Sequence, residues 1–348
     1  MERIRFFVPG PAWVRAEVRE AMSAPTIGHR GAAFAALYGS LQQPLREIFR
    51  TRGEVLLATG SATLVMESAV VSTVAGSVLH TTAGAFAERW LAISRSHGLD
   101  ADQLAVPWGQ AVDPDLLRQA LRRKRYDAVT VTHNETSTGT IHPLAELARV
   151  VREESDALVL VDAVSSLGGA EVETDAWDLD VVLAGSQKAL AAPPGLAVFT
   201  LSERAAARAA AVAHRGFYTD LLRYRRKHQE GGTITTPAIP ILFALQRQLV
   251  AIGAEGIETR WARHRELHAH AAAWAAREGF AYASGEGAHS PTVACLKPPA
   301  GVEAPTLVSQ LAKHGYTVGG GYGAWKPTTF RVGHMGEVQA ADLDELLA

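Results

Sequence analysis

Cysteine is almost absent from the sequence, with Cys295 as its single example among 348 residues. One thiol can form neither an intramolecular disulfide nor a zinc site built from several cysteines. Uninterrupted apolar runs are short as well, and none approaches the roughly 18 to 20 residues that a membrane-spanning helix needs. A signal peptide needs an apolar stretch near its start, whereas this chain begins with MERIRFFVPGP. These absences predict a soluble cytoplasmic protein.

A strong excess of one charge is also lacking. Lys and Arg total 34 and Asp and Glu total 36, so the formal net charge is −2. This balance gives no general attraction to nucleic acid or to an anionic membrane, and we expect neither as a partner. We also expect no metal site, because the basic neighbours of His264, His268 and His270 favour a solvated helix face. Hydrophobic residues make up 47% and charged residues 20%, which indicates a globular protein of one large unit or two modest domains.

Short apolar runs alternate with longer helical patterns through the first part of the chain. Several of these runs are apolar without alternation, which is typical of strands covered on both faces. The expected strands are 55–58, 78–81, 128–132, 158–161, 181–184 and 196–200. The expected helices lie near 62–75, 85–97, 114–124, 143–154 and 203–213. This order predicts an α/β fold with a mainly parallel sheet and helices on both of its faces.

The pattern changes after about residue 215. A long helical pattern runs from about Ile239 to beyond Trp274, with an expected break near Gly253–Gly256. Short strands and one helix follow, at 292–296, 305–314, 317–319 and 329–332. This tail predicts a small α+β domain. The expected division is an N-terminal segment 1–15, a large domain 16–250 and a small C-terminal domain 251–348.

Lys188 follows the apolar run 181–184 after Gly185-Ser186-Gln187. Open α/β sheets bind ligands at the carboxyl ends of their strands, which is where this lysine is expected. Desolvation there lowers the pKa of an amine and favours Schiff-base formation. The alternative is a solvated lysine that starts a loop.

Asp162 follows a second apolar run, 158–161. An isolated buried carboxylate is costly, so this one is expected to have a cationic partner or several hydrogen bonds. A pyridinium nitrogen is such a partner, and an aspartate that keeps the ring protonated makes pyridoxal phosphate an effective electron sink. Alternatively, Asp162 caps the next turn.

Two hydroxyl-rich segments also follow expected strands. In Thr59-Gly60-Ser61-Ala62-Thr63, glycine allows close approach of the backbone and the hydroxyls flank a helix N-terminus. This segment could bind a phosphate or simply cap the helix. It is not a Walker A loop, because no Gly-Lys-Ser/Thr follows. The run His133–Gly139 could donate hydrogen bonds to a phenolate oxygen or organise a turn.

An aromatic residue and an arginine complete the set of candidates. Phe86 could belong to the core or stack on a flat ring, whereas helical spacing favours a core position for Trp90. Arg331 lies inside the apolar run 329–332, and its planar guanidinium matches a carboxylate. A structural ion pair is the alternative. The glycines of 319–323 match a loose dinucleotide-binding pattern, but no helix follows them, so we do not expect such a site.

Taken in this order, these segments resemble the class V branch of fold-type I pyridoxal-phosphate enzymes, in particular the serine–pyruvate / alanine–glyoxylate aminotransferase family. The resemblance runs through nearly the whole chain, and the stretch around Lys188 is its most specific part. It is carried by Pro9-Gly10-Pro11, Gly28-His29-Arg30, Thr59–Thr63, Phe86, Glu88-Arg89-Trp90, His133–Gly139, Asp162–Gly169, Gly185–Leu190, Pro193-Pro194-Gly195, Thr236-Pro237 and Phe330–Gly336. It implies a mainly parallel seven-stranded sheet with helices on both faces and a smaller C-terminal α+β domain.

The resemblance also implies roles for the matching residues. Lys188 would form a Schiff base with pyridoxal phosphate and carry the proton between Cα and C4′, and Asp162 would pair with the pyridine nitrogen. Phe86 would stack on the ring, Thr136 would reach the phenolic oxygen, and Arg331 would bind the substrate carboxylate. The phosphate would be held by Ser61, Ala62 and Gln187. Further cofactor contacts would come from Gly60, Thr63, Val164, Thr233 and Thr236.

Thr233 and Thr236 match positions that, in relatives, reach the phosphate of the neighbouring subunit. The resemblance therefore implies a homodimer with shared active sites. Because Arg331 is the evident carboxylate anchor, we expect transamination from alanine or serine to glyoxylate or pyruvate, with ping-pong kinetics. If His29 and Arg30 face the pocket, they supply a second anionic subsite, and the donor is aspartate, phosphoserine or an aminophosphonate.

Two other classes remain open from the sequence. A lyase can use the same fold, because the fold does not fix the reaction. A desulfurase needs a mobile nucleophilic cysteine, and Cys295 lies in an expected strand where a thiol is buried and inert. A regulatory relative without catalysis is the other class, and the intact set of Lys188, Asp162 and Arg331 argues against it.

Overall fold

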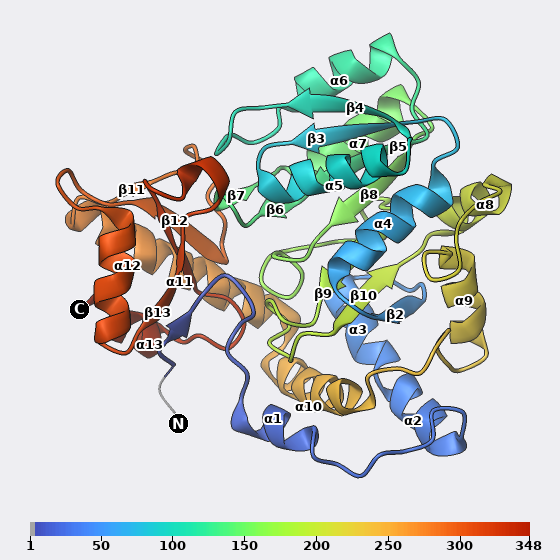
Figure 1. Cartoon of the computed structure of the whole chain (residues 1–348), viewed down its shortest axis with the longest axis horizontal. Coiled ribbons are helices and arrows are strands. Elements are labelled where there is room, and N and C mark those ends of the chain that lie inside the picture. The colour runs from blue at the N-terminus through green and yellow to red at the C-terminus, as the bar shows by residue number, and fades with distance from the viewer. Residues whose placement is uncertain (1–3) are drawn as a thin grey trace.

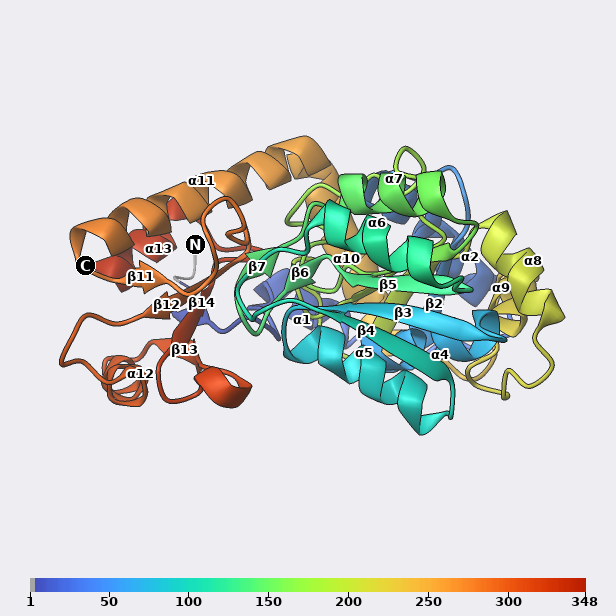
Figure 2. The ribbon, with the colours of Figure 1, turned by 90° about the horizontal axis from the view of Figure 1, so that it is seen from above.

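The structure is a computed structural model that describes residues 4–348. The first three residues of the expected N-terminal segment 1–15 lie outside the described residues. Figure 1 shows two parts, a larger one on the right and a smaller one on the left that contains the C-terminus. Figure 2 shows the larger sheet between two layers of helices, with α6 and α7 on one side and α4 and α5 on the other.

Seven strands of the described chain form the larger sheet. In spatial order they are β2 (Val55–Thr59), β10 (Leu196–Thr200), β9 (Val181–Gly185), β8 (Leu158–Asp162), β5 (Ala128–Thr132), β3 (Ser77–Thr82) and β4 (Asp100–Ala105). Strand β10 runs antiparallel to β2 and β9, and the other neighbouring pairs are parallel. The prediction of a mainly parallel seven-stranded α/β sheet is therefore confirmed.

Alternation along the central strands explains why both faces are covered. Val159 and Val161 pack into one core cluster with residues of α7, whereas Leu158 and Leu160 pack into another with residues of α4. Successive side chains of a strand point to opposite faces, so a strand that is apolar at every position must be buried on both sides. All six expected strands belong to this sheet and are buried at most of their positions.

Strand β4 is the member of the sheet that the apolar pattern missed. Its sequence, Asp-Ala-Asp-Gln-Leu-Ala, is polar, and its side chains are exposed or half-buried. It pairs only with β3 in the described chain because it lies at the edge of the sheet. Edge strands carry charged residues that discourage pairing with other chains, and such residues remove the apolar signal.

Helices connect the strands and cover the sheet. In the larger part they are α1 (Ala16–Ala21), α2 (Ala32–Ser40), α3 (Gln42–Phe49), α4 (Ala62–Thr73), α5 (Ala85–Ser96), α6 (Pro114–Arg123), α7 (Leu144–Glu154), α8 (Glu203–Ala211), α9 (Leu221–Gln229) and α10 (Ile239–Glu255). A small ladder, β6 (Asn134–Glu135) and β7 (Thr140–Ile141), follows β5. Helix α9 forms from the basic stretch after residue 221, where the Asp220 side chain accepts the Leu222 N–H and basic residues occupy the last turn.

The smaller part is built around a second sheet. Its order is β1 (Phe6–Phe7), β13 (Thr317–Gly320), β14 (Phe330–Gly333), β12 (Val293–Lys297) and β11 (Ala281–Tyr282). Helices α11 (Ile257–Arg277), α12 (Ala304–Lys313) and α13 (Ala340–Leu347) and a short 3₁₀ turn, η1 (Gly323–Trp325), accompany it. Figure 1 shows β1, in dark blue, beside β13.

Two connections join the parts of the chain. Strand β1 pairs in parallel with β13, so the N-terminal segment contributes to the C-terminal sheet. Helices α10 and α11 meet at Gly256, whose φ of 80° favours glycine and ends the first helix near the expected break. The division at residues 15 and 250 stays a prediction, since α10 runs across residue 250.

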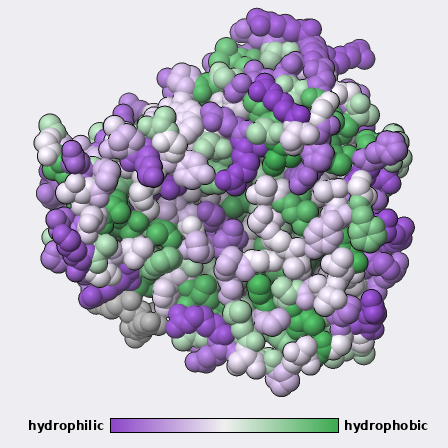
Figure 3. All heavy atoms as spheres, in the orientation of Figure 1, coloured by the Kyte–Doolittle hydropathy of each residue, from purple (hydrophilic) through white to green (hydrophobic). Residues whose placement is uncertain are grey.

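The outer surface mixes both kinds of side chain. Figure 3 shows hydrophilic residues along the right edge and at the top of this face, with hydrophobic residues scattered between them. Among residues 4–348, no helix combines the length and apolar character needed to cross a membrane. The same residues contain no group of three or more His, Cys, Asp or Glu side chains that could hold a metal ion.

Candidate active site

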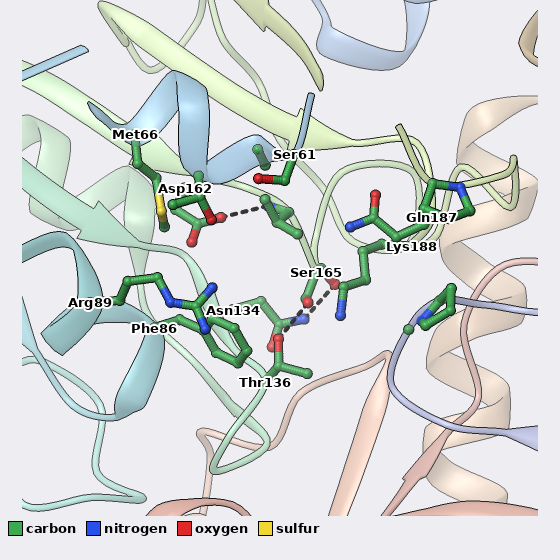
Figure 4. Close-up of a pocket in the computed structure, with 16 residues that line it drawn as sticks. Ser61, Met66, Phe86, Arg89, Asn134, Thr136, Asp162, Ser165, Gln187 and Lys188 are labelled. Carbon is green, nitrogen blue, oxygen red and sulfur yellow. Dashed lines mark hydrogen bonds between the residues drawn. The ribbon is translucent and has the colours of Figure 1, made fainter. Parts of the chain in front are cut away.

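A cavity of about 350 Å³ opens at the carboxyl ends of β5, β8 and β9. This is the edge at which open parallel sheets bind ligands, because loops and helix N-termini converge there. The residues that line it are Gly10, Pro11, Ser61, Ala62, Thr63, Met66, Phe86, Arg89, Asn134, Thr136, Asp162, Val164, Ser165, Gln187, Lys188 and Pro194. Figure 4 shows Lys188 and Asp162 on opposite sides of this cavity.

Lys188 lies three residues beyond the end of β9 and is partly buried. Its ammonium Nζ donates a hydrogen bond to the carbonyl oxygen of Pro9. Gly10 has a φ of +101°, which favours glycine, and a Cβ atom there would collide with the end of the Lys188 side chain. Burial, supported by the nearby Arg331 cation, lowers the pKa of Lys188 to about 8. The amine is thus partly neutral near physiological pH.

Asp162 ends strand β8, next to β9 in the sheet. Its Oδ1 accepts a hydrogen bond of 2.8 Å from the Val164 N–H. Burial raises the pKa of Asp162 to about 7, against the lowering effect of that hydrogen bond. The Glu135 carboxylate raises it further, and the Lys188 cation lowers it. A cation placed against this carboxylate would relieve the cost of its ionisation.

The third wall of the cavity is the N-terminus of α4. Ser61 has extended backbone angles and immediately precedes the helix, and Ala62 and Thr63 form its first positions. The first N–H groups of a helix have no partners within it, and the helix dipole favours an anion there. Gly60, with φ of +152°, makes the turn that aims these groups at the cavity, although it is not among the lining residues. Gln187 adds a side-chain amide.

Phe86 lies in the first turn of helix α5 and is held there by Glu135. The Glu135 carboxylate is buried and accepts hydrogen bonds from the backbone N–H groups of Phe86, at 3.1 Å, and Ala87, at 3.0 Å. It also accepts from the N–H and hydroxyl of Ser137. The close packing extends to Gly84, where a Cβ would lie 2.5 Å from Glu135 Cγ. Glu135 is therefore a positioning residue for the aromatic ring that faces the cavity.

Replacing Glu135 by alanine should leave the Phe86 and Ala87 N–H groups without an acceptor. We expect the free energy of unfolding to fall by about 1–3 kcal/mol and the ring of Phe86 to lose its fixed place. Thermal unfolding and near-ultraviolet circular dichroism measure the two effects. Glu146→Ala, which removes an exposed acid from the first turn of α7, is the matched control. If Glu135→Ala unfolded at the same temperature as the native protein, that result would contradict this role.

A polar network forms the cavity wall near β6. The hydroxyls of Thr136 and Ser165 are 2.5 Å apart, and the Asn134 amide donates to the carbonyl of Ser165, at 2.7 Å, and to the Thr292 hydroxyl. The Asn134 Oδ1 atom is buried and has no hydrogen-bond partner in the described chain. A buried acceptor without a partner is costly, so this wall suits a polar ligand.

Arg331 lies on β14, next to the cavity but not among the residues that line it. Its Nε donates to the Gly320 carbonyl at 2.9 Å and its Nη1 to the Thr136 carbonyl at 3.3 Å. Burial lowers the pKa of this arginine. Among residues 4–348 it forms no ion pair, so its guanidinium charge is not neutralised by a carboxylate of the described chain.

The model of the family "Aminotransferase class-V" matches residues 22–340 of the chain. The chain is a class-V aminotransferase. It is 38% identical to an uncharacterised aminotransferase of Methanocaldococcus jannaschii, over 94% of this chain and 87% of that protein. It is 30% identical to a serine–glyoxylate aminotransferase of Methylorubrum extorquens, over 98% and 88%. The crystal structure of an alanine–glyoxylate aminotransferase from Nostoc sp. matches 100% of this chain and 94% of that one, with a TM-score of 0.93 and 30% identity.

These comparisons confirm the family that the sequence resemblance indicated, and with it an enzyme that transfers amino groups to 2-oxo acids. Class-V membership also implies pyridoxal phosphate as the cofactor. The structure brings most of the expected site residues of this class-V aminotransferase into one cavity: Ser61, Ala62, Thr63, Phe86, Thr136, Asp162, Val164, Gln187 and Lys188. Sequence reasoning gave no role to the lining residues Met66, Arg89, Asn134, Ser165 and Pro194.

Besides Gly60 and Arg331, four expected site residues do not line this cavity. His29 and the exposed Arg30 lie in the loop before α2. Thr233 is partly buried, and its hydroxyl donates to the Thr235 carbonyl at 2.7 Å, whereas Thr236 is exposed. The single chain thus leaves these residues of the class-V aminotransferase outside its own cavity, and their roles stay predictions.

Proposed function

We propose that this class-V aminotransferase uses pyridoxal 5′-phosphate to move the amino group of alanine or serine to glyoxylate or pyruvate. The observation that carries the proposal is one cavity with a lysine amine of lowered pKa on one side and a buried carboxylate on the other. An amine and an anion on opposite sides match the two ends of the cofactor ring that need them.

The residues present fit this cofactor. Ser61, Ala62 and Thr63 at the α4 N-terminus, with Gln187, would hold the phosphate through N–H and side-chain donors. The orphaned Oδ1 of Asn134 and the hydroxyls of Thr136 and Ser165 suit its polar edge. Phe86 and Val164 would cover the faces of the ring. When bound, the cofactor supplies an aldehyde for amines and an electron-withdrawing ring that stabilises a carbanion.

The reaction then rests on two side chains that hold or move charge. Lys188 Nζ, as the neutral amine, takes the proton from the substrate Cα and later returns one on the same side of the cavity. Asp162, as the carboxylate, keeps a cationic ring nitrogen in place, because a buried anion favours a cation beside it. Arg331 would bind the substrate carboxylate and so orient the Cα–H bond toward Lys188.

The lowered pKa of Lys188 predicts a pH profile for its reaction with aldehydes. Only the neutral amine is nucleophilic, so the rate of attachment of added pyridoxal phosphate should rise with pH up to about 8 and level off above it. Stopped-flow absorbance on cofactor-free enzyme gives this profile. A rate that keeps rising past pH 10, the range of an ordinary lysine, would refute the assigned environment.

A lyase on the same fold is the competing reaction. The desulfurase form is disfavoured because Cys295 is buried in β12, where burial raises the pKa of its thiol to about 11. A β-elimination lyase would release ammonia and an oxo acid from serine without an acceptor, whereas a transaminase keeps the nitrogen until an oxo acid takes it.

A donor and acceptor panel tests the proposed function. Cofactor-loaded enzyme is mixed with alanine, serine, aspartate or phosphoserine, and glyoxylate or pyruvate is added in a second step. We expect one equivalent of oxo acid per site in the first step and a new amino acid in the second, both read by mass spectrometry. Release of free ammonia in the first step would contradict the proposed transamination and show that the enzyme is a lyase.

Two threonines outside the cavity support a shared site. We propose a cytoplasmic homodimer in which Thr233 and Thr236 of one subunit reach the phosphate end of the other, since neither lines the cavity of its own chain. His29 and Arg30 also lie outside their own cavity, so in this homodimer an anionic subsite that they form would belong to the cavity of the partner subunit. Analytical ultracentrifugation of the loaded enzyme measures the assembly.

A further inference from the structure

Arg89 is a second guanidinium at the cavity that the proposed function does not use. It lies on α5, one turn beyond Phe86, and lines the cavity. Its guanidinium carbon is 4.7 Å from the centre of the Phe86 ring, and Figure 4 shows the two side chains next to each other. Its charge lowers the pKa of both Asp162 and Lys188, so its field acts across the cavity.

The described chain supplies Arg89 with no carboxylate partner. Its polar contact is with the Tyr322 hydroxyl, which accepts a hydrogen bond of 3.4 Å from Nη2. Arginines of the outer helices behave differently, since Arg118 and Arg122 both pair with Glu154, at 2.5 and 2.8 Å. A partly buried cation without a counter-ion is costly, and it suits a site where an anionic ligand supplies the missing charge.

Tyr322 links Arg89 to the expected carboxylate anchor. The Arg331 guanidinium is 5.5 Å from the centre of the Tyr322 ring, and the Tyr322 and Phe86 rings are also 5.5 Å apart. One tyrosine therefore contacts both arginines, which places two cations beside one cavity. A substrate with an anion at each end needs such an arrangement, whereas a substrate with one carboxylate needs only Arg331.

His29 and Arg30 were expected to supply a second anionic subsite only if they face the pocket, and neither residue lines the cavity of its own chain. Arg89 does line it, and it comes from the same helix as Phe86. Among the described residues that line the cavity, Arg89 is thus a cation that could meet a second anion.

We propose that Arg89, positioned by Tyr322, binds a second anionic group, a carboxylate or a phosphate, on the side chain of an acidic amino donor. This inference rests on the proposed function and names a further substrate class for the same site. Small donors bind through Arg331 alone, and acidic donors bind through Arg331 and Arg89 together. The enzyme then accepts aspartate-like donors in one half-reaction and a small oxo acid in the other.

Non-reacting analogues test the subsite without turnover. Isothermal titration calorimetry of the cofactor-loaded enzyme compares succinate with succinamate, its analogue with one neutral end, and with 3-phosphonopropanoate. We expect at least about tenfold tighter binding of succinate than of succinamate, because a site built around a cation rejects the neutral group. The affinity for 3-phosphonopropanoate, compared with that for succinate, shows whether the subsite prefers a phosphate-like group or a carboxylate. Equal affinity for succinate and succinamate in the native enzyme overturns the proposal, whatever the variants do.

Variants locate the effect. Arg89→Gln should weaken the binding of succinate by about tenfold and change the affinity for succinamate by no more than about twofold. Arg89→Lys should recover part of the lost affinity for succinate. Tyr322→Phe, which removes the hydroxyl that holds Arg89, should weaken succinate by only a few fold. Arg95→Gln removes the same charge from an exposed position of the same helix and serves as the control. Equal losses for both analogues in Arg89→Gln would show a supporting role only and reject the subsite.

Kinetics separate this proposal from the proposed function. In Arg89→Gln, kcat/KM should fall at least about tenfold further for aspartate than for alanine, and this difference should arise mainly through KM. Amino transfer from alanine without discrimination between succinate and succinamate would refute the subsite and keep the proposed function. Discrimination between the analogues, with no amino transfer from any donor, would keep the subsite and refute the proposed function.

Discussion

Lys188→Ala is expected to lower the rate of amino transfer by roughly 10⁴-fold or more, because one side chain is both the attachment point and the proton carrier. No other lysine lines the cavity of the described chain, so none stands ready to replace it. Single-turnover mixing of the cofactor-loaded variant with alanine measures the effect. Lys297→Ala, which removes an exposed lysine from β12, should keep native rates.

The loss should be chemical and not structural. Removing Lys188 also removes a partly buried amine whose pKa is already lowered by burial, so the folded chain gives up a group that is costly to charge. We therefore expect thermal unfolding of the cofactor-free variant close to that of the native chain. A variant that unfolds normally and still transfers amino groups at the native rate would remove Lys188 from the mechanism.

Asp162→Asn should have the second largest effect. Asparagine keeps the shape of the side chain but removes the anion that would hold a cationic ring nitrogen. We expect the half-reaction with alanine to slow by roughly 10³-fold and the cofactor to bind more weakly. Asp162→Glu, which restores the charge on a longer side chain, should recover part of the rate. Transient kinetics and cofactor titration measure the two quantities.

The same substitution should stabilise the cofactor-free protein. The folded state raises the pKa of Asp162 from 3.8 to about 7, so the neutral form is favoured by folding. This contribution to stability is present below pH 3.8 and is lost as the pH rises through about 7. At pH 8, where the carboxylate is ionised, asparagine removes that cost. A lower unfolding temperature of Asp162→Asn at pH 8 would contradict the burial argument.

The sequence was sufficient for the parts of the fold and site that depend on short-range patterns. Central runs such as 158–161 are apolar at every position, and a residue that directly follows such a run lies at the ligand-binding edge of the sheet. On that basis the sequence alone predicts that Lys188 and Asp162 lie at the same edge of the sheet. Strand β4 escaped this reasoning, because an edge strand with polar side chains lacks the apolar signal.

Contacts between distant segments could not be predicted in this way. Glu135 was visible in a run of hydroxyl residues, but the N–H groups at the start of α5 that donate to it depend on how β6 packs against that helix. Arg89 and Tyr322 are 233 positions apart, and their contact depends on how the two sheets sit relative to each other. In such cases the signal of a functional residue is a carboxylate that follows a buried strand, or an arginine that faces a cavity without a charged partner.

The most direct test of the central claim is reduction of the cofactor-loaded enzyme with borohydride, followed by peptide mapping by mass spectrometry. The account predicts that one peptide, the one that contains Lys188, carries the mass of the reduced cofactor in stoichiometric amount. An unmodified Lys188, or a cofactor fixed to a different lysine, would contradict it.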